Sequence, residues 1–203
     1  MNSTTAKIMK HINSRPIGEP FSSLECMEMG SRAAVDQALS RMTKAGHLSR
    51  VARGVYVRPK ISAHVGEVPP EAFKVAETIA KQMGNRIQVS GAEAARRMGL
   101  STQVPTRSVF YTNGPSRKVT LGKMTIILKK VSPRKLALAG RPAGLALTAL
   151  WYLGKEAVTS ETIMQIKAKI PQSEFEVLCS SQRFMPGWMH DVFIKFKREA
   201  YHG

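Results

Sequence analysis

The 203-residue sequence has few acidic residues, two cysteines and no long hydrophobic run. Only 14 Asp and Glu accompany 31 Lys and Arg, which gives a formal net charge of +17. The two cysteines lie far apart, with no second Cys or His at metal-ligand spacing, which argues against both a disulfide framework and a zinc site. The longest apolar stretch, residues 145–153, is far shorter than the roughly 20 residues that span a bilayer, and the first residues hold no signal-peptide core. We therefore expect a soluble, cytoplasmic protein.

The sequence also lacks the common catalytic patterns. It contains no Gly-rich phosphate loop followed by Lys-Ser/Thr and no paired carboxylates in a polar cluster. The histidines are scattered, and none is spaced for a triad or a metal: His11, His47, His64, His190 and His202. We therefore expect a protein that is not an enzyme and that uses no metal or cofactor.

The positive charge is concentrated in two regions. Residues 1–60 hold ten basic and four acidic residues, a net charge of +6, and residues 86–141 hold twelve basic residues and one acid, Glu93, a net charge of +11. The last 62 residues are nearly balanced, with seven basic and six acidic residues. Because 43% of the residues are hydrophobic, the chain is not a disordered basic tail. We expect a folded protein with this charge pattern to bind a polyanionic partner.

Three helices are predicted before residue 46. Ser3 caps the first, in which Ile8 and Ile12 share one face. Ser22 and Glu25 have the spacing of a capping box at the start of a short second helix. The third runs over residues 31–45, and its apolar side chains lie at helical spacing: Val35, Ala38, Leu39 and Met42.

A hairpin is predicted after the third helix. Residues 48–51 and 55–57 are short apolar pieces joined by Ala52-Arg53-Gly54, with Arg50 and Arg53 at the tip. Three helices and a basic hairpin are typical of a winged helix-turn-helix, in which the third helix enters the major groove of DNA. Asp36 on the exposed face is expected to pair with Arg32 or to accept a hydrogen bond from a cytosine amino group, and Tyr56 either contacts a phosphate or packs under the wing. The predicted DNA-binding residues are Ser31, Arg32, Ala33, Gln37, Arg41, Lys44, Arg50, Arg53 and Tyr56.

The rest of the chain predicts a second domain. Residues 61–70 are expected to be a linker between the winged helix of residues 1–60 and an α+β domain over residues 71–203. We expect short strands at 87–89, 108–112, 118–121 and 124–130, helices at 71–83 and 92–98, and a C-terminal group of four helices beyond residue 142. The fold class is therefore α+β, with a small sheet in the second domain. Its predicted basic surface comprises Arg96, Arg97, Arg107, Arg117, Lys118, Lys129, Lys130, Arg134 and Lys135.

Several segments resemble a known family. Residues 39–56 are similar to the winged-helix segment of AbiEi-type antitoxins, and residues 90–95, 100–105, 111–117 and 132–140 resemble the antitoxin domain that follows it in that family. The resemblance covers nearly the whole chain and implies an N-terminal winged helix joined to an antitoxin C-terminal domain.

This resemblance implies the antitoxin of a type IV toxin–antitoxin system of the abortive-infection, phage-defence type. Such an antitoxin binds promoter DNA and represses its own operon, with help from the basic surface of its second domain. The second domain counteracts a nucleotidyltransferase-like toxin without necessarily binding it. Two alternatives remain open from the residues alone: an RNA-binding protein, or a direct protein inhibitor of the toxin, each using the basic surface of residues 86–141.

Overall fold

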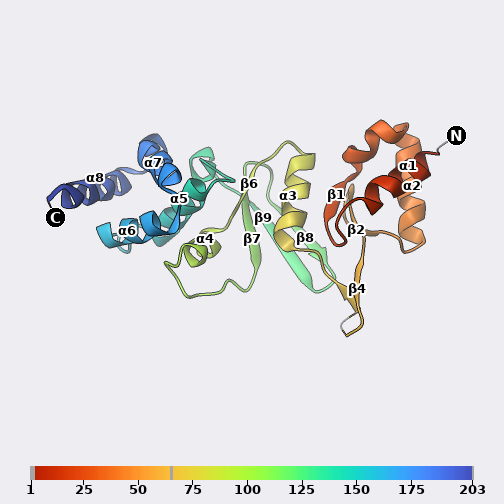
Figure 1. The fold of residues 1–203 in the computed structure, drawn as a ribbon, viewed down its shortest axis with the longest axis horizontal. Coiled ribbons are helices and arrows are strands. Elements are labelled where there is room, and N and C mark those ends of the chain that lie inside the picture. The colour runs from red at the N-terminus through yellow and green to blue at the C-terminus, as the bar shows by residue number, and fades with distance from the viewer. Residues whose placement is uncertain (1–2, 65, 203) are drawn as a thin grey trace. The chain divides into compact units, whose positions relative to one another are not determined.

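The structure is a computed structural model that describes residues 3–64 and 66–202, with side chains up to Glu199. The chain is a mixed α+β protein, as the sequence predicts (Figure 1). Within the part of the chain that the structure describes, every helix is too short or too polar to traverse a lipid bilayer.

Residue contacts divide the chain into two compact units. Unit 1 comprises the described residues up to Asn85 together with Lys118–Ile126, and unit 2 comprises Arg86–Arg117 and the described residues from Ile127 onward. Unit 1 therefore takes in the predicted linker, residues 61–70, and the helix that the sequence assigns to the second domain.

The N-terminal part of unit 1 holds four helical segments and five short strands. They are α1 (Thr4–Asn13), β1 (Pro20–Ser22), the 3-10 helix η1 (Ser23–Met29), α2 (Arg32–Lys44), β2 (Ser49–Ala52), β3 (Val55–Val57), β4 (Lys60–Ser62), β5 (Gly66–Val68) and α3 (Ala72–Gln82). The predicted second helix is thus a 3-10 helix rather than an α-helix, and β1, β4 and β5 were missed.

Serine caps set where these helices begin. The Ser3 hydroxyl accepts from the Ala6 backbone N–H at 3.2 Å. The Ser22 hydroxyl accepts from the Leu24 N–H at 3.2 Å, while the Ser22 N–H donates to Glu25 Oε1 at 2.7 Å. These two bonds make the capping box that the sequence predicts, because each satisfies a backbone or side-chain group that the first helical turn leaves unpaired.

The predicted hairpin is part of a three-stranded antiparallel sheet in the order β1-β3-β2. Phe21 pairs with Tyr56 across β1 and β3, and Arg50 pairs with Tyr56 across β2 and β3. A register shift between Arg50 and Ala52 bends β2 before the turn. Gly54 allows that turn because its φ is +72°.

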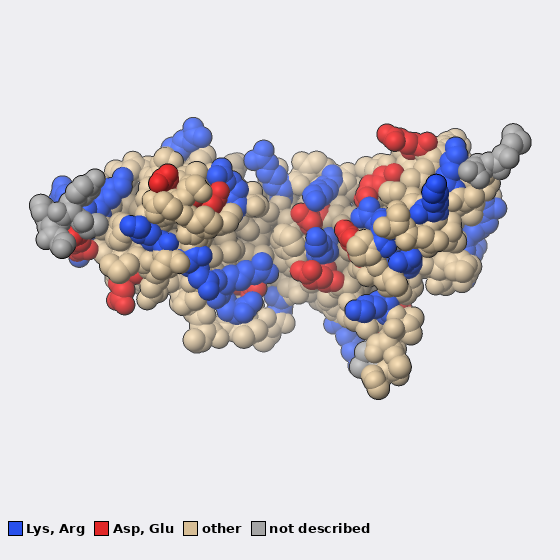
Figure 2. Space-filling model, viewed as in Figure 1, with Lys and Arg blue, Asp and Glu red and all other residues tan. Residues whose placement is uncertain are grey.

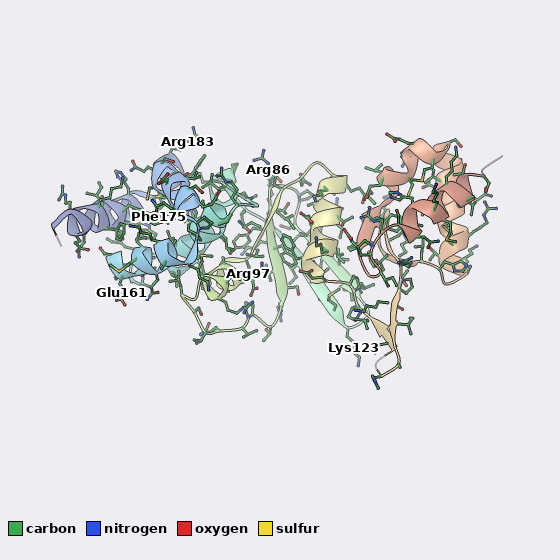
Figure 3. The ribbon with its side chains drawn as sticks, in the orientation of Figure 1. Arg86, Arg97, Lys123, Glu161, Phe175 and Arg183 are labelled. Atoms are coloured by element: carbon green, nitrogen blue, oxygen red, sulfur yellow. The ribbon has the colours of Figure 1, made fainter. Side chains whose placement is uncertain are left out.

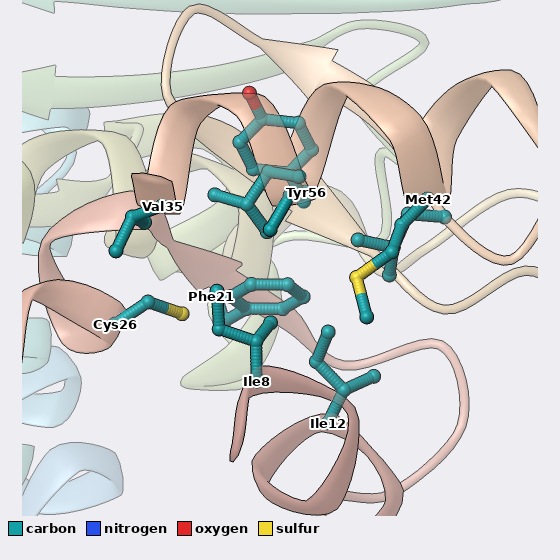
Figure 4. Close-up of a cluster of buried hydrophobic side chains, with 10 residues drawn as sticks. Ile8, Ile12, Phe21, Cys26, Val35, Met42 and Tyr56 are labelled. Carbon is teal, nitrogen blue, oxygen red and sulfur yellow. The ribbon is translucent and has the colours of Figure 1, made fainter. Parts of the chain in front are cut away.

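The core of unit 1 is formed by the apolar faces of α1, η1 and α2 over this sheet (Figure 4). Ile8, Phe21, Val35 and Leu39 are each 0–1% exposed. Phe21 and Tyr56 pack as tilted rings whose centroids are 6.0 Å apart. This packing fixes which face of α2 is buried.

A hairpin and a helix that follow β3 also belong to unit 1. β4 and β5 form an antiparallel hairpin within the predicted linker, with Ile61 opposite Glu67. α3 packs against β1 and β3 through an apolar stripe that includes Val75 and Ile79. Prolines 69 and 70 therefore separate a hairpin from a helix within unit 1.

A four-stranded sheet and a group of helices make up the remaining structure. They are β6 (Ile87–Val89), α4 (Gly91–Arg97), β7 (Ser108–Thr112), β8 (Arg117–Leu121), β9 (Met124–Lys130), η2 (Pro133–Leu136), α5 (Pro142–Leu153), α6 (Ser160–Lys169), α7 (Gln172–Ser180), η3 (Gln182–Phe184) and α8 (Gly187–His202). The strand order is β6-β7-β9-β8. The predicted strands and the group of four helices beyond residue 142 are confirmed, the strands to within a few residues, whereas the 3-10 helices η2 and η3 were missed.

Small residues bring α4 and α5 into close contact in unit 2. A Cβ added at Gly91 would overlap the Tyr152 side chain, and one added at Gly144 would overlap the carbonyl oxygen of Leu138. Leu138 has a φ of +61°, which is unfavourable for a residue with a side chain. Glycine at 144 is therefore required by the close approach of the loop before α5.

This packing predicts different effects for two Gly→Ala substitutions. Gly144→Ala should lower the free energy of unfolding by about 1–3 kcal/mol, because the added methyl group meets backbone. Gly187→Ala, where the Cβ would meet open space, should change it by less than about 0.5 kcal/mol. Urea unfolding followed by circular dichroism measures both. Equal midpoints for the two variants would contradict the prediction.

Candidate nucleic-acid interface

The polar face of α2 is exposed along its length. Arg32, Ala33, Gln37, Arg41 and Lys44 are all exposed. The side chains on the opposite face, among them Val35 and Leu39, are buried in the core. At 1.5 Å per residue, the 13 residues of α2 make a rod about 20 Å long, a size that fits a major groove about 12 Å wide.

The polar groups on this face are weakly held by other protein groups. Arg32 Nε lies 3.9 Å from Asp36 Oδ2, but both side chains are more than half exposed, so this ion pair contributes little. An Arg41 guanidinium nitrogen donates to Thr5 Oγ1 at the long distance of 3.4 Å. Ser31 is exposed too, but its hydroxyl already accepts from the Ala34 N–H at 3.4 Å as the N-cap of α2. Arg32 and Arg41 are thus available to an external anion.

Arg50 and Arg53 lie on the β2–β3 hairpin with exposed side chains. The hairpin turn is anchored rather than free, because the Gly54 carbonyl accepts from the Ser23 N–H at 2.8 Å. A Cβ at Gly54 would overlap the Gln82 amide of α3. Only Arg53 lies in this turn; Arg50, which the sequence places at the tip, lies in β2 opposite Tyr56, and both arginines are exposed.

Tyr56 is a correction to the predicted set of DNA-binding residues. Its side chain is 8% exposed and packs against Phe21 in the core of unit 1. It lies in the middle strand of the sheet, between β1 and β2. Tyr56 is therefore a core residue, the second of the two roles that its position in the strand allowed.

Charge on the described surface is predominantly basic, as the view in Figure 2 shows. In unit 2, however, part of the predicted basic surface is neutralised within the protein. Arg96 binds Glu93 through Nε and a terminal guanidinium nitrogen, each at 2.8 Å, and Arg97 Nε binds the same carboxylate at 2.8 Å. The hydrogen bond from Arg96 is the main cause that lowers the pKa of Glu93 from 4.5 to about 2. The three groups together carry only one net positive charge.

Two further predicted cations are engaged by unit 2 itself. An Arg134 guanidinium nitrogen donates to the Met185 carbonyl at 2.7 Å. The Lys135 ammonium lies 5.4 Å from the centroid of the Trp151 ring, a cation–π distance. Both side chains thus help to hold the helices of unit 2, which lowers their availability to a ligand.

Four other cations of unit 2 gather at one end of the four-stranded sheet. We call Arg86, Arg117, Lys129 and Lys130 the sheet-end cluster. All four are exposed. The ion pairs among the described residues of unit 2 involve other cations.

Backbone hydrogen bonds hold the chain segments of the cluster together. The Arg86 N–H donates to Asn113 Oδ1 at 2.7 Å, the Lys130 N–H donates to Ser116 Oγ at 2.9 Å, and the Val131 N–H donates to the Thr112 carbonyl at 3.0 Å. The start of β6 therefore meets the residue after β7, and the end of β9 meets both the end of β7 and the loop before β8. In Figure 3, Arg86 lies at this end of the sheet, away from Arg97 on α4.

The two remaining predicted residues lie elsewhere. Arg107 is exposed in the segment before β7, and Lys118 is exposed on β8 in unit 1. Arg86 was not among the predicted binding residues. The signal that could have found it is the strand pairing of β6 with β7, since Ile87 pairs with Thr112 directly beside the Asn113-Gly114 turn.

The described residues contain no cluster of metal ligands and two protonated thiols. Among them, no three His, Cys, Asp or Glu side chains are placed to hold a metal ion. Burial raises the pKa of the Cys26 thiol to about 11 and also raises that of Cys179. Both thiols are therefore protonated, and weakly nucleophilic, at neutral pH.

Comparisons with known proteins give one family match. A model of a family described as "Family of unknown function (DUF6088)" matches residues 7–178. No curated protein matches the chain. Among solved structures, the chain is similar to the crystal structure of the RV2827C protein from Mycobacterium tuberculosis, with a TM-score of 0.42 and 13% sequence identity over 96% of this chain and 82% of that one.

The neutralisation of Arg96 and Arg97 can be tested by removing the Glu93 charge. Glu93→Gln frees two arginines, so binding to duplex DNA of random sequence should tighten. The slope of log K against log salt should steepen by about 0.9 for each phosphate newly contacted. Fluorescence anisotropy between 50 and 200 mM salt measures the slope.

Glu161→Gln is the matched control. It changes the net charge by the same amount, at an exposed position on α6 that lies outside the basic segment of residues 86–141. An equal response of the two variants would show that net charge alone, and not the release of Arg96 and Arg97, sets the affinity.

Proposed function

We propose that this chain, which belongs to the DUF6088 family, is a cytoplasmic protein that binds duplex DNA of a particular sequence and represses transcription. The observation that carries the proposal is the exposed polar face of α2 beside two exposed hairpin arginines, Arg50 and Arg53. In a winged helix these are the elements that face the major groove and the adjacent phosphates.

The element order of unit 1 supports the winged-helix interpretation. Three helical segments precede a hairpin whose second strand, β3, lies between β1 and β2. The buried stripe of α2 leaves Gln37 and Arg41 at the surface. Gln and Arg are the side chains that bind adenine and guanine edges in the major groove through paired hydrogen bonds.

The sheet-end cluster of unit 2 is proposed as a second phosphate-binding surface. Four like charges at one end of a sheet repel one another, and an external polyanion relieves that repulsion. Together with α2 and the hairpin, the exposed cations suffice for 6–10 phosphate contacts. We therefore expect affinity to fall by about 10³–10⁵ between 50 and 200 mM salt.

Duplex DNA is favoured over single-stranded RNA by the supply of aromatic side chains. Recognition of single strands depends on bases stacking on exposed aromatic rings. Phe110 is only 6% exposed, and Tyr111 is half-buried. Residues 86–141 thus offer only one partly exposed aromatic ring among the described side chains. This supply suits contact with phosphates better than stacking with bases.

The biological role that we propose is that of a type IV antitoxin, and it rests on the resemblance of the chain to AbiEi-type antitoxins. In this role unit 1 binds promoter DNA and represses the operon that encodes the pair. Unit 2 counteracts a nucleotidyltransferase-like toxin. The chain itself then needs no catalytic group and no cofactor.

Two kinds of variant separate base reading from phosphate binding. Gln37→Ala should cost about 1–3 kcal/mol on the promoter duplex and much less on a random duplex, because it removes a base contact. Arg50→Ala combined with Arg53→Ala should weaken binding to both duplexes and reduce the salt slope by about 0.9 per lost contact. Gel-shift titrations at several salt concentrations measure both effects.

Lys169→Ala is the control, an exposed lysine in the C-terminal third, where charge is nearly balanced. It should leave affinity and slope unchanged. If Gln37→Ala loses equal affinity on both duplexes, α2 positions the protein without reading bases.

Repression and toxin neutralisation should be separable by point variants. The Arg50→Ala/Arg53→Ala variant should lose repression of a promoter–reporter fusion, yet still rescue growth of cells that express the toxin. Point variants are preferable to deleting residues 1–60, because that deletion would uncover the face of α3 that packs on β1 and β3. A folded variant that fails to rescue growth would refute this division of labour.

A further inference from the structure

The hairpin formed by β4 and β5, residues 60–68, is a structured extension of unit 1, and we call it the β-arm. Lys60 pairs with Val68, Ile61 with Glu67 and Ser62 with Gly66. In Figure 1 the β-arm projects away from the helices of unit 1. Most of its described residues, among them Lys60 and His64, are exposed.

The β-arm ends a long stretch of the chain without acidic residues. Residues 37–66 contain no Asp or Glu, and they hold six basic residues: Arg41, Lys44, Arg50, Arg53, Arg58 and Lys60. The first acid after this stretch is Glu67, whose Oε1 accepts from the Ser49 hydroxyl at 2.8 Å. The basic residues of α2, the hairpin and the start of the β-arm therefore follow one another with no acid between them in the sequence, although Asp36 of α2 and Glu67 of the β-arm are exposed.

An apolar side chain is exposed on the β-arm. Ile61 is 71% exposed, so it contributes little to the core of unit 1. It lines a groove that Met42 and His47, at the C-terminal end of α2, also line. The base of the β-arm thus lies beside the end of the helix that is proposed to read DNA.

We infer that the β-arm is a second DNA-binding element, which enters the minor groove next to the major groove taken by α2. In this arrangement Lys60 binds a backbone phosphate, and Ile61 contacts the floor of the groove or wedges between base pairs. This inference rests on the proposed function.

Three observations favour duplex DNA as the occupant. Two-stranded β-ribbons bind DNA grooves, and proteins that bind the minor groove insert apolar side chains such as Ile between base steps. Lys60, the exposed neighbour of Ile61, complements the phosphates that wall the groove, whereas Arg58 donates to Asn13 Oδ1 and to the Arg15 carbonyl within unit 1. The base of the β-arm lies beside the C-terminal end of α2, the helix that is proposed to enter the adjacent major groove.

Two variants test the inference on the full-length protein with the promoter duplex. Ile61→Ser should remove the DNA bend measured by circular permutation and the minor-groove protection seen in hydroxyl-radical footprints, while the salt slope is unchanged. Lys60→Ala should reduce the salt slope by about 0.9, the value for one phosphate contact.

Ile17→Ser is the matched control, since Ile17 is an apolar residue that is 56% exposed outside the β-arm. It should behave like the unaltered protein, and circular dichroism checks that each variant is folded. If the β-arm variants bind, bend and protect DNA as the unaltered protein does, the inference is overturned.

The outcomes also distinguish this inference from the proposed function. The Gln37→Ala and Arg50→Ala/Arg53→Ala variants could bind DNA poorly while the β-arm variants bind normally. That result would support the proposed repressor function and overturn the role of the β-arm. If the unaltered protein bound no duplex DNA, both the proposed function and the inference about the β-arm would be overturned. Loss of a dimer on Ile61→Ser, measured by light scattering in the absence of DNA, would assign the β-arm to self-association and overturn its role in DNA binding.

Discussion

The proposed interface depends on one buried stripe along α2. The four apolar side chains of this stripe are 0–3% exposed against α1, η1 and the sheet: Val35, Ala38, Leu39 and Met42. Successive helical residues are separated by about 100°, so burial of this stripe fixes the opposite face in solvent. A rotation of α2 by one residue would bury Gln37 or Asp36 without a partner, at a cost of several kcal/mol. The hydrophobic core therefore determines which polar side chains reach a groove.

The few acidic residues are placed selectively. Glu93 binds Arg96 and Arg97, and Glu174 binds Arg141 while also accepting from the Ala143 N–H at the start of α5. These carboxylates serve the helices of unit 2. The cations of the sheet-end cluster and of residues 37–66 take part in none of the ion pairs among the described residues, and their charge stays available for an external anion.

Local patterns in the sequence predicted most of the helices and strands, because caps and periodicity act over a few residues. Ser3, Ser22 and Ser31 cap the predicted helices, and the apolar stripe of α2 is buried as expected. What the sequence did not predict depends on partners far along the chain. β1 is a strand because β3 lies beside it, and α3 belongs to unit 1 because its apolar stripe packs on β1 and β3.

In the candidate site too, local sequence patterns predicted some residues, and contacts with distant parts of the chain determine the others. Exposure of Arg53 followed from its position at a turn, whereas Arg50 is exposed on the edge strand β2 and Tyr56 is buried because β3 is the middle strand. The spacing of Glu93 with Arg96 and Arg97 fits ion pairs on one helix, and the structure shows how completely they are formed. Arg86 joins the sheet-end cluster through strand pairing alone, which no local pattern reports.

Affinity and specificity come from different residues of this surface. The many cations on α2, the hairpin and the sheet end offer affinity for any duplex, because phosphates are the same at every step. Sequence discrimination has to come from exposed side chains of α2 that meet base edges, and Gln37, Ser40 and Asp36 are the uncharged or acidic ones. Asp36 repels phosphate, so its retention on the exposed face favours a role in base reading, where a carboxylate accepts from a cytosine amino group. The repressor that we propose requires such a group, since charge alone would hold a protein this basic anywhere on the chromosome.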